Sequence, residues 1–448
     1  MYFRLSFNPE QMAKQLFFSI ALLITLGVFS FTIYRLSRWF KFTKPFPVSE
    51  YGKRFNRMMA VAFGQSKILR SPVIGLLHAL VFWGFMVITL GSVEMVIEGL
   101  TGMERPMDMT GWFYGFVTAS GDIMAYVVLC AIMAFLIRRL FMHIKRFYGI
   151  EMQKNSKWDA LIALAIIFLL MKSLIGLNMS YLALHTEDAK GIFPISSLLL
   201  PFYSGFLSPA SATVLHEVYW WSHILLIFIF ANILPYSKHF HVFTSIPNVF
   251  LSRLEPLGYL PNMESVTREV KLMLNPETAF AAASADAPAP LRFGVKDVED
   301  VTWKNYFDSL ACTECGRCTS VCPANITGKK LSPRKIFIDL RARMKEKGPG
   351  MVMKGLEYSD GKSLLKDYIT AEELWACTTC NACAQECPVN INHPSLIVEM
   401  RRYLVMEESA APSGLNMMFT NIENNGAPWQ FSPQDRMKWA ENLEIANF

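Results

Sequence analysis

The stretch Cys312-Thr-Glu-Cys315-Gly-Arg-Cys318-Thr-Ser-Val-Cys322-Pro323 places four cysteines in the order C-x2-C-x2-C-x3-C-P. The same order recurs at Cys377-Thr-Thr-Cys380-Asn-Ala-Cys383-Ala-Gln-Glu-Cys387-Pro388. This spacing brings several thiolates to one iron–sulfur cube and is typical of [4Fe–4S] sites. Two copies therefore predict two clusters and one-electron chemistry.

The fourth cysteine of each run is expected to serve the other cluster, as it does in two-cluster ferredoxins. The predicted ligand sets are Cys312, Cys315, Cys318 and Cys387 for one cluster, and Cys377, Cys380, Cys383 and Cys322 for the other. The alternative is a pair of structural zinc sites. Zinc ribbons usually show paired C-x2-C knuckles rather than four cysteines in one run before a proline, so the spacing favours iron–sulfur clusters.

The number of cysteines outside the two runs indicates the cellular compartment of the cluster region. Of 9 cysteines, all but Cys130 belong to the two runs. Cys130 lies in an apolar stretch and is interpreted as a small buried hydrophobic residue. No pair is left for a disulfide, which favours a reducing compartment, the cytoplasm, for the cluster region.

The first half of the chain is strongly apolar. The 448 residues are 52% hydrophobic and only 18% charged, with a mean hydropathy of +0.27. A membrane span takes about 20 helical residues. Five stretches meet that need and predict five transmembrane helices: Leu16–Tyr34, Ser71–Val93, Ile123–Ile137 extended back through Phe113–Gly121, Ala160–Leu184 and Val218–Ser237.

Loop charges predict the orientation of these helices. The loops after the first and third are rich in lysine and arginine, whereas those after the second and fourth are acidic or mixed. Basic loops stay in the cytoplasm, so the N-terminus is predicted outside and the C-terminal half inside. The net charge of +6 mostly reflects this bias and carries no indication of nucleic-acid binding.

These observations predict an all-α protein, with a five-helix transmembrane bundle followed by a mainly helical dicluster [4Fe-4S] ferredoxin domain. The insert between the cysteine runs has helical texture, with Ser332 as a cap and Pro333 in the first turn. Alanine and proline repeat through Phe280–Pro290, which suggests a linker or hairpin. The predicted boundaries are 1–253 for the membrane domain, 254–290 for the linker, 291–411 for the dicluster domain and 412–448 for a tail that contacts a partner.

Histidines inside the predicted spans are candidate haem ligands, because a polar ring in a membrane is costly without a partner. His78, His223 and His241 are the favoured set. His223 and His241 are 18 positions apart and would share one face of a continuous helix, offset by about 27 Å, although Pro235 intervenes. For His185, His216 and His239 an ordinary hydrogen-bonded role is at least as good an interpretation.

The stretch from Trp220-Trp221-Ser222-His223 to Pro247 resembles the cytochrome b (gamma) subunit of respiratory nitrate reductase. That family has two bis-histidine haems, with ligands on the second and fifth helices. The resemblance implies that His78, in Gly75-Leu76-Leu77-His78, pairs with His241. The family's other ligand on helix two would fall near Ile88, where no histidine stands. His223 would then lack a second haem ligand or use another partner, such as His185 or His216.

The chain as a whole resembles membrane iron–sulfur oxidoreductases related to heterodisulfide reductase, including its tail segments Asn421–Trp429 and Arg436–Ala440. The resemblance implies electron transfer between a quinone and a cytoplasmic redox partner. Larger members continue into cysteine-rich CCG domains, which do not occur before Phe448. A separate cytoplasmic subunit with such domains, or a flavoprotein, is therefore the expected partner.

Lys172 lies near the middle of the fourth predicted helix, where a charge is costly. It is expected either to face a haem propionate or a quinone, or to reach water inside the bundle.

The favoured function is that of a quinone-linked iron–sulfur oxidoreductase subunit of the bacterial inner membrane, containing two [4Fe-4S] clusters and one or two haem b groups. One alternative is a haem-free membrane anchor that tethers a soluble iron–sulfur reductase. A redox sensor with labile clusters ranks below both, because no output domain is visible.

Overall fold

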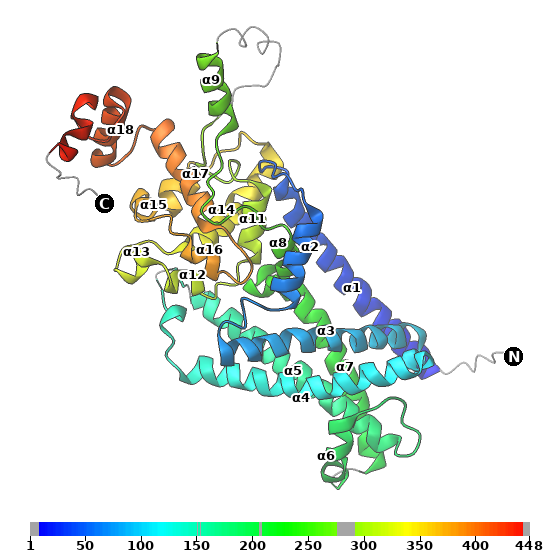
Figure 1. The fold of residues 1–448 in the computed structure, drawn as a ribbon. Helices are drawn as coiled ribbons and strands as arrows, with labels where there is room; N and C mark the ends of the chain where they lie inside the picture. Colours follow the sequence, from blue (N-terminus) through cyan, green and yellow to red (C-terminus); the bar gives the residue numbers. More distant parts are fainter. Residues whose placement is uncertain (1–8, 150, 153, 206–207, 276–291, 442–448) are drawn as a thin grey trace.

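The computed structural model describes residues 9–149, 151–152, 154–205, 208–275 and 292–441. Within these ranges the chain is all helical, and its only β-type pairings are two isolated bridges, Lys44 with Thr302 and Leu365 with Ile369. Figure 1 shows a bundle of long helices and, at one end of it, a compact domain of shorter helices. The predicted fold class, an all-helical membrane bundle followed by a helical cluster domain, is confirmed.

Five helices are long and apolar enough to span a membrane, which confirms the five predicted spans. Each runs past its apolar stretch, because the helix continues into the polar residues at its ends. They are α1 Pro9–Phe40, α3 Pro72–Thr101, α4 Trp112–Phe141, α5 Lys154–Leu184 and α7 Pro209–Ile233.

Helix α5 lies against α4 and α7, while α3 lies against α4 and α1. Glycines allow two of these close approaches. A Cβ on Gly99 of α3 would lie 2.7 Å from the ring of Phe18 on α1, and one on Gly176 of α5 would lie 2.5 Å from Tyr219 on α7. Small residues at helix crossings are the usual means of close packing between membrane helices.

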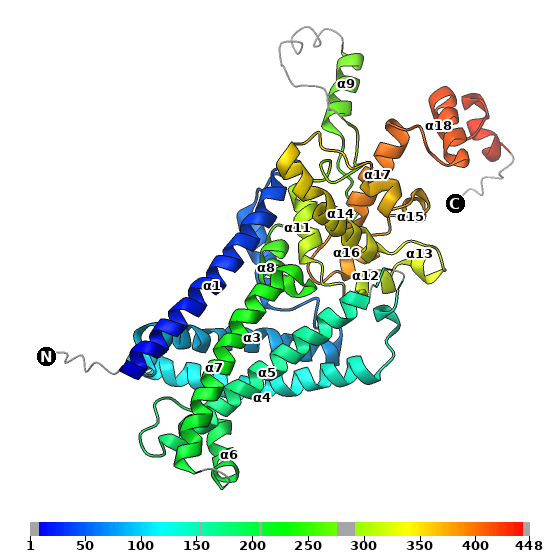
Figure 2. The same ribbon diagram turned by 180° about the vertical axis from the view of Figure 1, so that it is seen from behind.

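Two shorter helices in the connections were not predicted from the sequence: α2 Tyr51–Met58 and α6 Pro194–Ser204. The position of α6 depends on Asp122 of α4, which is 1% exposed. Its carboxylate accepts hydrogen bonds from the backbone N–H groups of Ile195 (2.8 Å) and Ser196 (3.0 Å). Free N–H groups at a helix start favour such an acceptor. Figure 2 shows α6 at the end of the bundle away from the cluster domain.

The fifth span does not continue as one helix to His241. Helix α7 ends at Ile233, two short 3-10 turns follow at Leu234–Tyr236 and Lys238–Phe240, and α8 begins at His241 and ends at Phe250. Pro235 cannot donate the backbone bond that an α-helix needs, which accounts for the break. The shared face and the offset of about 27 Å expected for His223 and His241 apply only to a continuous helix, so this break removes their basis.

The cluster domain is built from short helices around the long α14, Pro333–Lys354, which confirms the predicted helical insert. Ser332 caps α14 by accepting from the N–H of Lys335, and Pro333 stands in the first turn. The remaining helices of this domain are α11 Trp303–Ala311, α12 Arg317–Ser320, α13 Pro323–Ile326, α15 Ala371–Trp375, α16 Ala382–Glu386 and α17 His393–Met406.

The membrane helices and the cluster domain share one hydrophobic core. Trp39, at the end of α1, and Phe240, before α8, are both buried in the core of the cluster domain. The ring of Phe40 lies 4.7 Å from that of Tyr306 on α11. Docking through a shared core holds the cluster domain against the bundle.

Helices α9 Glu264–Leu274 and α18 Ser413–Asn425 project from the cluster domain in both views (Figures 1 and 2). Helix α9 lies in the predicted linker, and α18 lies in the predicted tail. The Phe280–Pro290 stretch lies outside the described residues.

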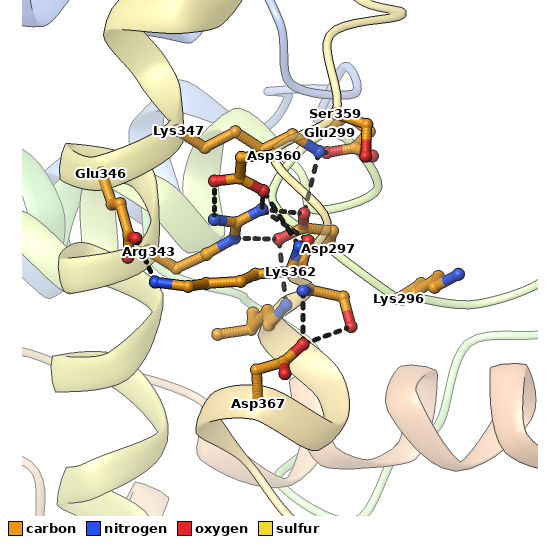
Figure 3. A network of polar contacts seen from close by, with 12 residues as sticks. Lys296, Asp297, Glu299, Arg343, Glu346, Lys347, Ser359, Asp360, Lys362 and Asp367 are labelled. Carbon is orange, nitrogen blue, oxygen red and sulfur yellow. Dashed lines mark hydrogen bonds and ion pairs between the residues drawn. The ribbon is translucent and has the colours of Figure 1, made fainter.

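A buried ionic network ties the segment before α11 to α14 (Figure 3). Arg343 is fully buried and donates to Asp297 (2.8 and 2.9 Å) and Asp360 (2.6 and 2.8 Å). Lys347 donates to Asp297 and Glu299, each at 2.8 Å. Each buried charge in this network has a partner of opposite sign, which offsets the cost of burying it. The network joins three chain segments: the one with Asp297 and Glu299, helix α14, and the one with Asp360.

Candidate metal centres

The two cysteine loops have the same backbone conformation. In the first, Glu314 and Gly316 on either side of Cys315 have positive φ (55° and 74°). In the second, Thr379 and Asn381 on either side of Cys380 do the same (53° and 61°). Non-glycine residues rarely adopt this region, so its repetition at matching positions indicates that both loops are shaped for one purpose. A short helix, α12 or α16, follows each loop.

The structure brings together the cysteines that the cross-ligation pattern pairs. Helix α12 lies against α16, so the two runs are neighbours. Cys377 and Cys383 interact electrostatically with Cys322 from the other run. One cavity between the runs is lined by the first predicted set, Cys312, Cys315, Cys318 and Cys387.

A [4Fe–4S] cube distributes its four thiolates over four irons, whereas zinc holds all four on one ion. Within the described ranges no three His, Cys, Asp or Glu side chains gather tightly enough to hold a single metal ion. The ligand sets remain a prediction.

Burial controls the chemistry of these thiols. It raises the pKa of Cys312 to about 11, and those of Cys383 and Cys387 to about 12. Cys380 is exposed at the surface, whereas Cys315, at the matching position of the first loop, is only partly exposed. Thiolates in such sites need bound metal and nearby cations, since burial alone favours the protonated form.

The membrane domain supplies cations to the first set. Lys67, in the segment before α3, donates to the carbonyl oxygens of Cys387 (3.1 Å) and Ala384 (3.4 Å). Arg317 of α12 donates back to the carbonyl of Lys67 at 3.0 Å. Arg146, in the connection from α4 to α5, interacts electrostatically with Cys315. The first set therefore lies at the boundary with the membrane helices, and we call it the proximal set.

A buried ion pair holds this boundary. Arg334 of α14 is 1% exposed and donates to the carboxylate of Glu151 at 2.7 and 2.9 Å. It also donates to the carbonyl of Arg146 at 2.8 Å. Sequence reasoning missed these contacts, because their partners lie almost 200 positions apart in the chain.

The other set, Cys322, Cys377, Cys380 and Cys383, has neighbours from the cluster domain itself. Arg401 of α17 donates to the carbonyl of Cys377 and lies 4.9 Å from the centre of the Trp375 ring. Because Cys380 is exposed, this set reaches the surface of the protein, and we call it the distal set.

Behind the proximal set lie His78 of α3 and His241 of α8, close enough to interact electrostatically with each other. His78 is also within electrostatic range of Arg317 on α12. The Nδ1 atom of His78 is buried without a hydrogen-bond partner. His241 Nδ1 donates to the carbonyl of Lys238 at 3.1 Å, which leaves its Nε2 lone pair free. Metal-ligating histidines are commonly oriented by such a hydrogen bond, so His241 fits the predicted inner haem. For His78 the fit rests on its buried, unpartnered ring nitrogen.

His223 of α7 lies deeper in the bundle and is 1% exposed. Its Nδ1 donates to the carbonyl of Leu170 at 3.1 Å and lies 3.0 Å from the hydroxyl of Ser173. His223 and His216 both line a separate cavity of about 80 Å³. Ile88 of α3 lines the same cavity.

The histidine candidates His185 and His239 form contacts with neighbouring protein groups. His185 Nδ1 contacts the carbonyl of Tyr181 at 3.2 Å, and its Nε2 lies 3.5 Å from Glu104. His239 Nδ1 contacts the hydroxyl of Ser237 at 2.9 Å. These are the hydrogen-bonded roles that the sequence left open for both residues.

Two residues lie on the outer surface of the bundle, and the predicted burial of Cys130 was wrong. Lys172 is exposed on the outer face of α5, in line with Trp158, Ile162 and Leu169, rather than facing the bundle interior, and its contact with a haem propionate or a quinone stays a prediction. Cys130 is exposed on α4. In both cases the helix is apolar all round, so its sequence does not reveal which face lies against protein and which faces lipid.

Comparison with known proteins supports the metal centres. Residues 311–391 match the family described as "4Fe-4S dicluster domain". The chain is 29% identical over 427 residues to the "Probable iron-sulfur-binding oxidoreductase FadF" of Bacillus subtilis, covering 88% of this chain and 56% of that protein. It is 29% identical over 410 residues to the "EtfAB:quinone oxidoreductase" of Syntrophomonas wolfei, covering 86% and 53%.

A shorter similarity, 36% identity over 173 residues, links the chain to a "Probable membrane-anchored ferredoxin" of Chromohalobacter salexigens, covering 36% of this chain and 26% of that protein. No solved structure matches. The chain spans about half the length of the first two relatives. The chain thus carries a 4Fe-4S dicluster domain behind five candidate membrane helices, and its relatives are iron–sulfur oxidoreductases.

Proposed function

We propose that this protein transfers electrons between a quinone in the membrane and a cytoplasmic redox partner. The observation that carries the proposal is the order of the centres. The distal set reaches the surface at Cys380, the proximal set lies at the membrane boundary beside Lys67, and His78 and His241 lie behind it. The two clusters and a b-type haem would each carry one electron at a time.

Side chains of the protein would tune the potentials of these centres and hold them in place. Lys67 and Arg146 bring positive charge to the proximal set, which favours its reduced state. His78 and His241 come from two different helices, α3 and α8, and would bind one iron from opposite sides. Docking through Trp39, Phe240 and the Arg334–Glu151 pair keeps the distance between these centres constant.

The partner is proposed to dock near Cys380 and to be a subunit with CCG-type cysteine-rich domains or a flavoprotein. The printed names of the relatives, which include an EtfAB:quinone oxidoreductase, support a quinone and a protein partner. We place the protein in the bacterial inner membrane with the cluster domain in the cytoplasm. The basic loops, which carry Lys67 and Arg146, lie on the same side as that domain.

The test is purification of the native complex, followed by optical and EPR spectra before and after addition of a quinol. We expect about eight irons per chain, a low-spin b-type haem, and reduction of the haem and clusters by quinol. Zinc in place of iron would contradict the clusters. A preparation with clusters and no haem, in which quinol reduces nothing, would favour the alternative of a haem-free membrane anchor.

A further inference from the structure

We propose that the cavity beside His223 binds the ring of the quinone, at the place where the resembled cytochromes hold a second haem. The inference rests on the proposed function and assigns its substrate to named residues. The cavity is lined by residues of α3, α4, α5 and α7 and by Phe193, which directly precedes α6 at the end of the bundle away from the cluster domain (Figure 2).

Three polar side chains of α7 line this cavity, and two of them have a buried ring nitrogen without a hydrogen-bond partner. Trp220 is 1% exposed, and its indole N–H has no hydrogen-bond acceptor. The Nδ1 atom of His216 is buried and also lacks a partner. His216, Trp220 and His223 are spaced four and three residues apart, which places them on one face of a helix. A buried donor without an acceptor is costly, so a ligand oxygen is expected opposite Trp220.

His223 complements that donor. Because its Nδ1–H donates to the carbonyl of Leu170, its Nε2 carries a lone pair and can accept a proton. A quinol oxygen accepts from Trp220 and donates to His223, whereas a quinone oxygen accepts from Trp220. The pair of groups therefore matches both redox forms of one ring oxygen.

Other residues that line the cavity are acidic or aromatic. Glu98 of α3 lines the cavity, and within the described residues no group donates a hydrogen bond to its side-chain carboxylate. Glu104, in the connection after α3, lines it nearer the outer end. The rings of Tyr181 and Phe193 also border the cavity and offer an apolar surface to a flat ring.

A second haem fits these residues less well. A bis-histidine iron needs ligands on opposite faces, and none of the α3 residues that line the cavity with His223, Ile88 among them, is a histidine. His216 and His223 lie on the same helix about 10 Å apart along its axis, so they cannot hold one iron between them. His185 does not line the cavity and already contacts Tyr181 and Glu104.

The chemistry balances with the proposed electron carriers. Oxidation of a quinol breaks two O–H bonds and releases two electrons and two protons. The electrons leave one at a time toward the His78–His241 site. One proton goes to His223 Nε2 and the other to Glu98, from which Glu104 leads to the surface. Quinone reduction is the reverse.

The experiment uses the detergent-purified holoprotein and a 1,4-naphthoquinone that carries a photoreactive azide. We expect the label on peptides covering residues 85–98 and 209–223, with protection by excess menadione. Trp220→Phe keeps the ring and removes the N–H, so it should raise the menadiol concentration for half-maximal haem reduction by about 3- to 10-fold. Trp112→Phe makes the same chemical change at an exposed site and should have no effect.

Haem content provides the decisive counter-test. Two haems per chain in the unsubstituted protein, with one lost in His223→Leu, would overturn the inference, because His223 would then be an iron ligand. Labelling at another site with normal haem reduction by menadiol would also overturn it while leaving the proposed function intact. If menadiol fails to reduce the haem of the unsubstituted protein, the proposed function itself fails.

Discussion

The ammonium group of Lys67 lies 3.1 Å from the carbonyl oxygen of Cys387, although the two residues are 320 positions apart. Lys67 precedes the membrane helix α3, and Cys387 closes the second cysteine run. A cation from the membrane domain thus contacts the proximal set at Cys387, the ligand that comes from the second cysteine run. This contact joins the two halves of the protein at the point where an electron would pass between them.

Lys67→Met should lower the reduction potential of the proximal cluster. We estimate that the positive charge of half-buried Lys67 stabilises the reduced cluster by about 1 kcal/mol, which corresponds to roughly 40 mV for a one-electron couple. Lys67→Arg keeps the charge and should recover most of the potential. Lys330→Met removes an exposed lysine and serves as the control. Redox titration followed by EPR measures both clusters, and equal shifts in both would refute a local effect.

Cys322→Ser should change the EPR signal of the distal cluster, although Cys322 belongs to the first cysteine run. The reason is that Cys322 lies beside Cys377 and Cys383, while Cys387 lines the cavity with Cys312 and Cys315. Cys387→Ser is the matched variant and should change the proximal signal. A spectrum in which each substitution affects the cluster of its own run would show that the ligand sets are not exchanged.

His78→Ala and His241→Ala should each remove the same low-spin b-type signal, because the two rings would bind one iron. His223→Ala should leave that signal in place, since His223 lies in the separate outer cavity. Haem quantification together with EPR of membranes checks both statements. Loss of two different signals from the first pair would disprove their pairing.

Asp297→Asn should destabilise the cluster domain by about 3 kcal/mol, because it leaves the buried Arg343 and Lys347 without their shared carboxylate. The rate at which cluster absorbance is lost on heating measures the effect. Glu372→Gln breaks an ion pair whose partners are both exposed and should change little. Equal stability of Asp297→Asn and the unsubstituted protein would mean that the network does not hold the domain together.

The ionic network around Arg343 should make the stability of the cluster domain depend on pH. Burial alone would raise the pKa of Asp297, but hydrogen bonds from Arg343 and Lys347 outweigh it and hold the pKa below its usual value. The hydrogen bond from Arg343 also lowers the pKa of Asp360. Stability from both carboxylates is therefore present above the ordinary pKa of aspartate and is lost as the pH falls through the lowered values. Unfolding curves from pH 7 down to about pH 2 should show this loss begin at about pH 4, and Asp297→Asn should reduce it.

The sequence by itself determined the class of the protein. Cysteine spacing is local, so the two runs were sufficient to predict two clusters, and an apolar stretch of about 20 residues predicts a membrane span wherever it occurs. The helical insert was also predictable, because Ser332 and Pro333 are start signals within a few residues of the helix that they begin.

Only the tertiary structure decided which residues meet. A helix that is apolar all round carries no record of its buried face, so neither the outward position of Lys172 nor that of Cys130 could be predicted. The break after Ile233 removed the regular helical phase that would have related His223 to His241. Contacts such as Lys67 with Cys387 join segments far apart in the chain, and no local pattern encodes them, because they form only when packing brings their helices together.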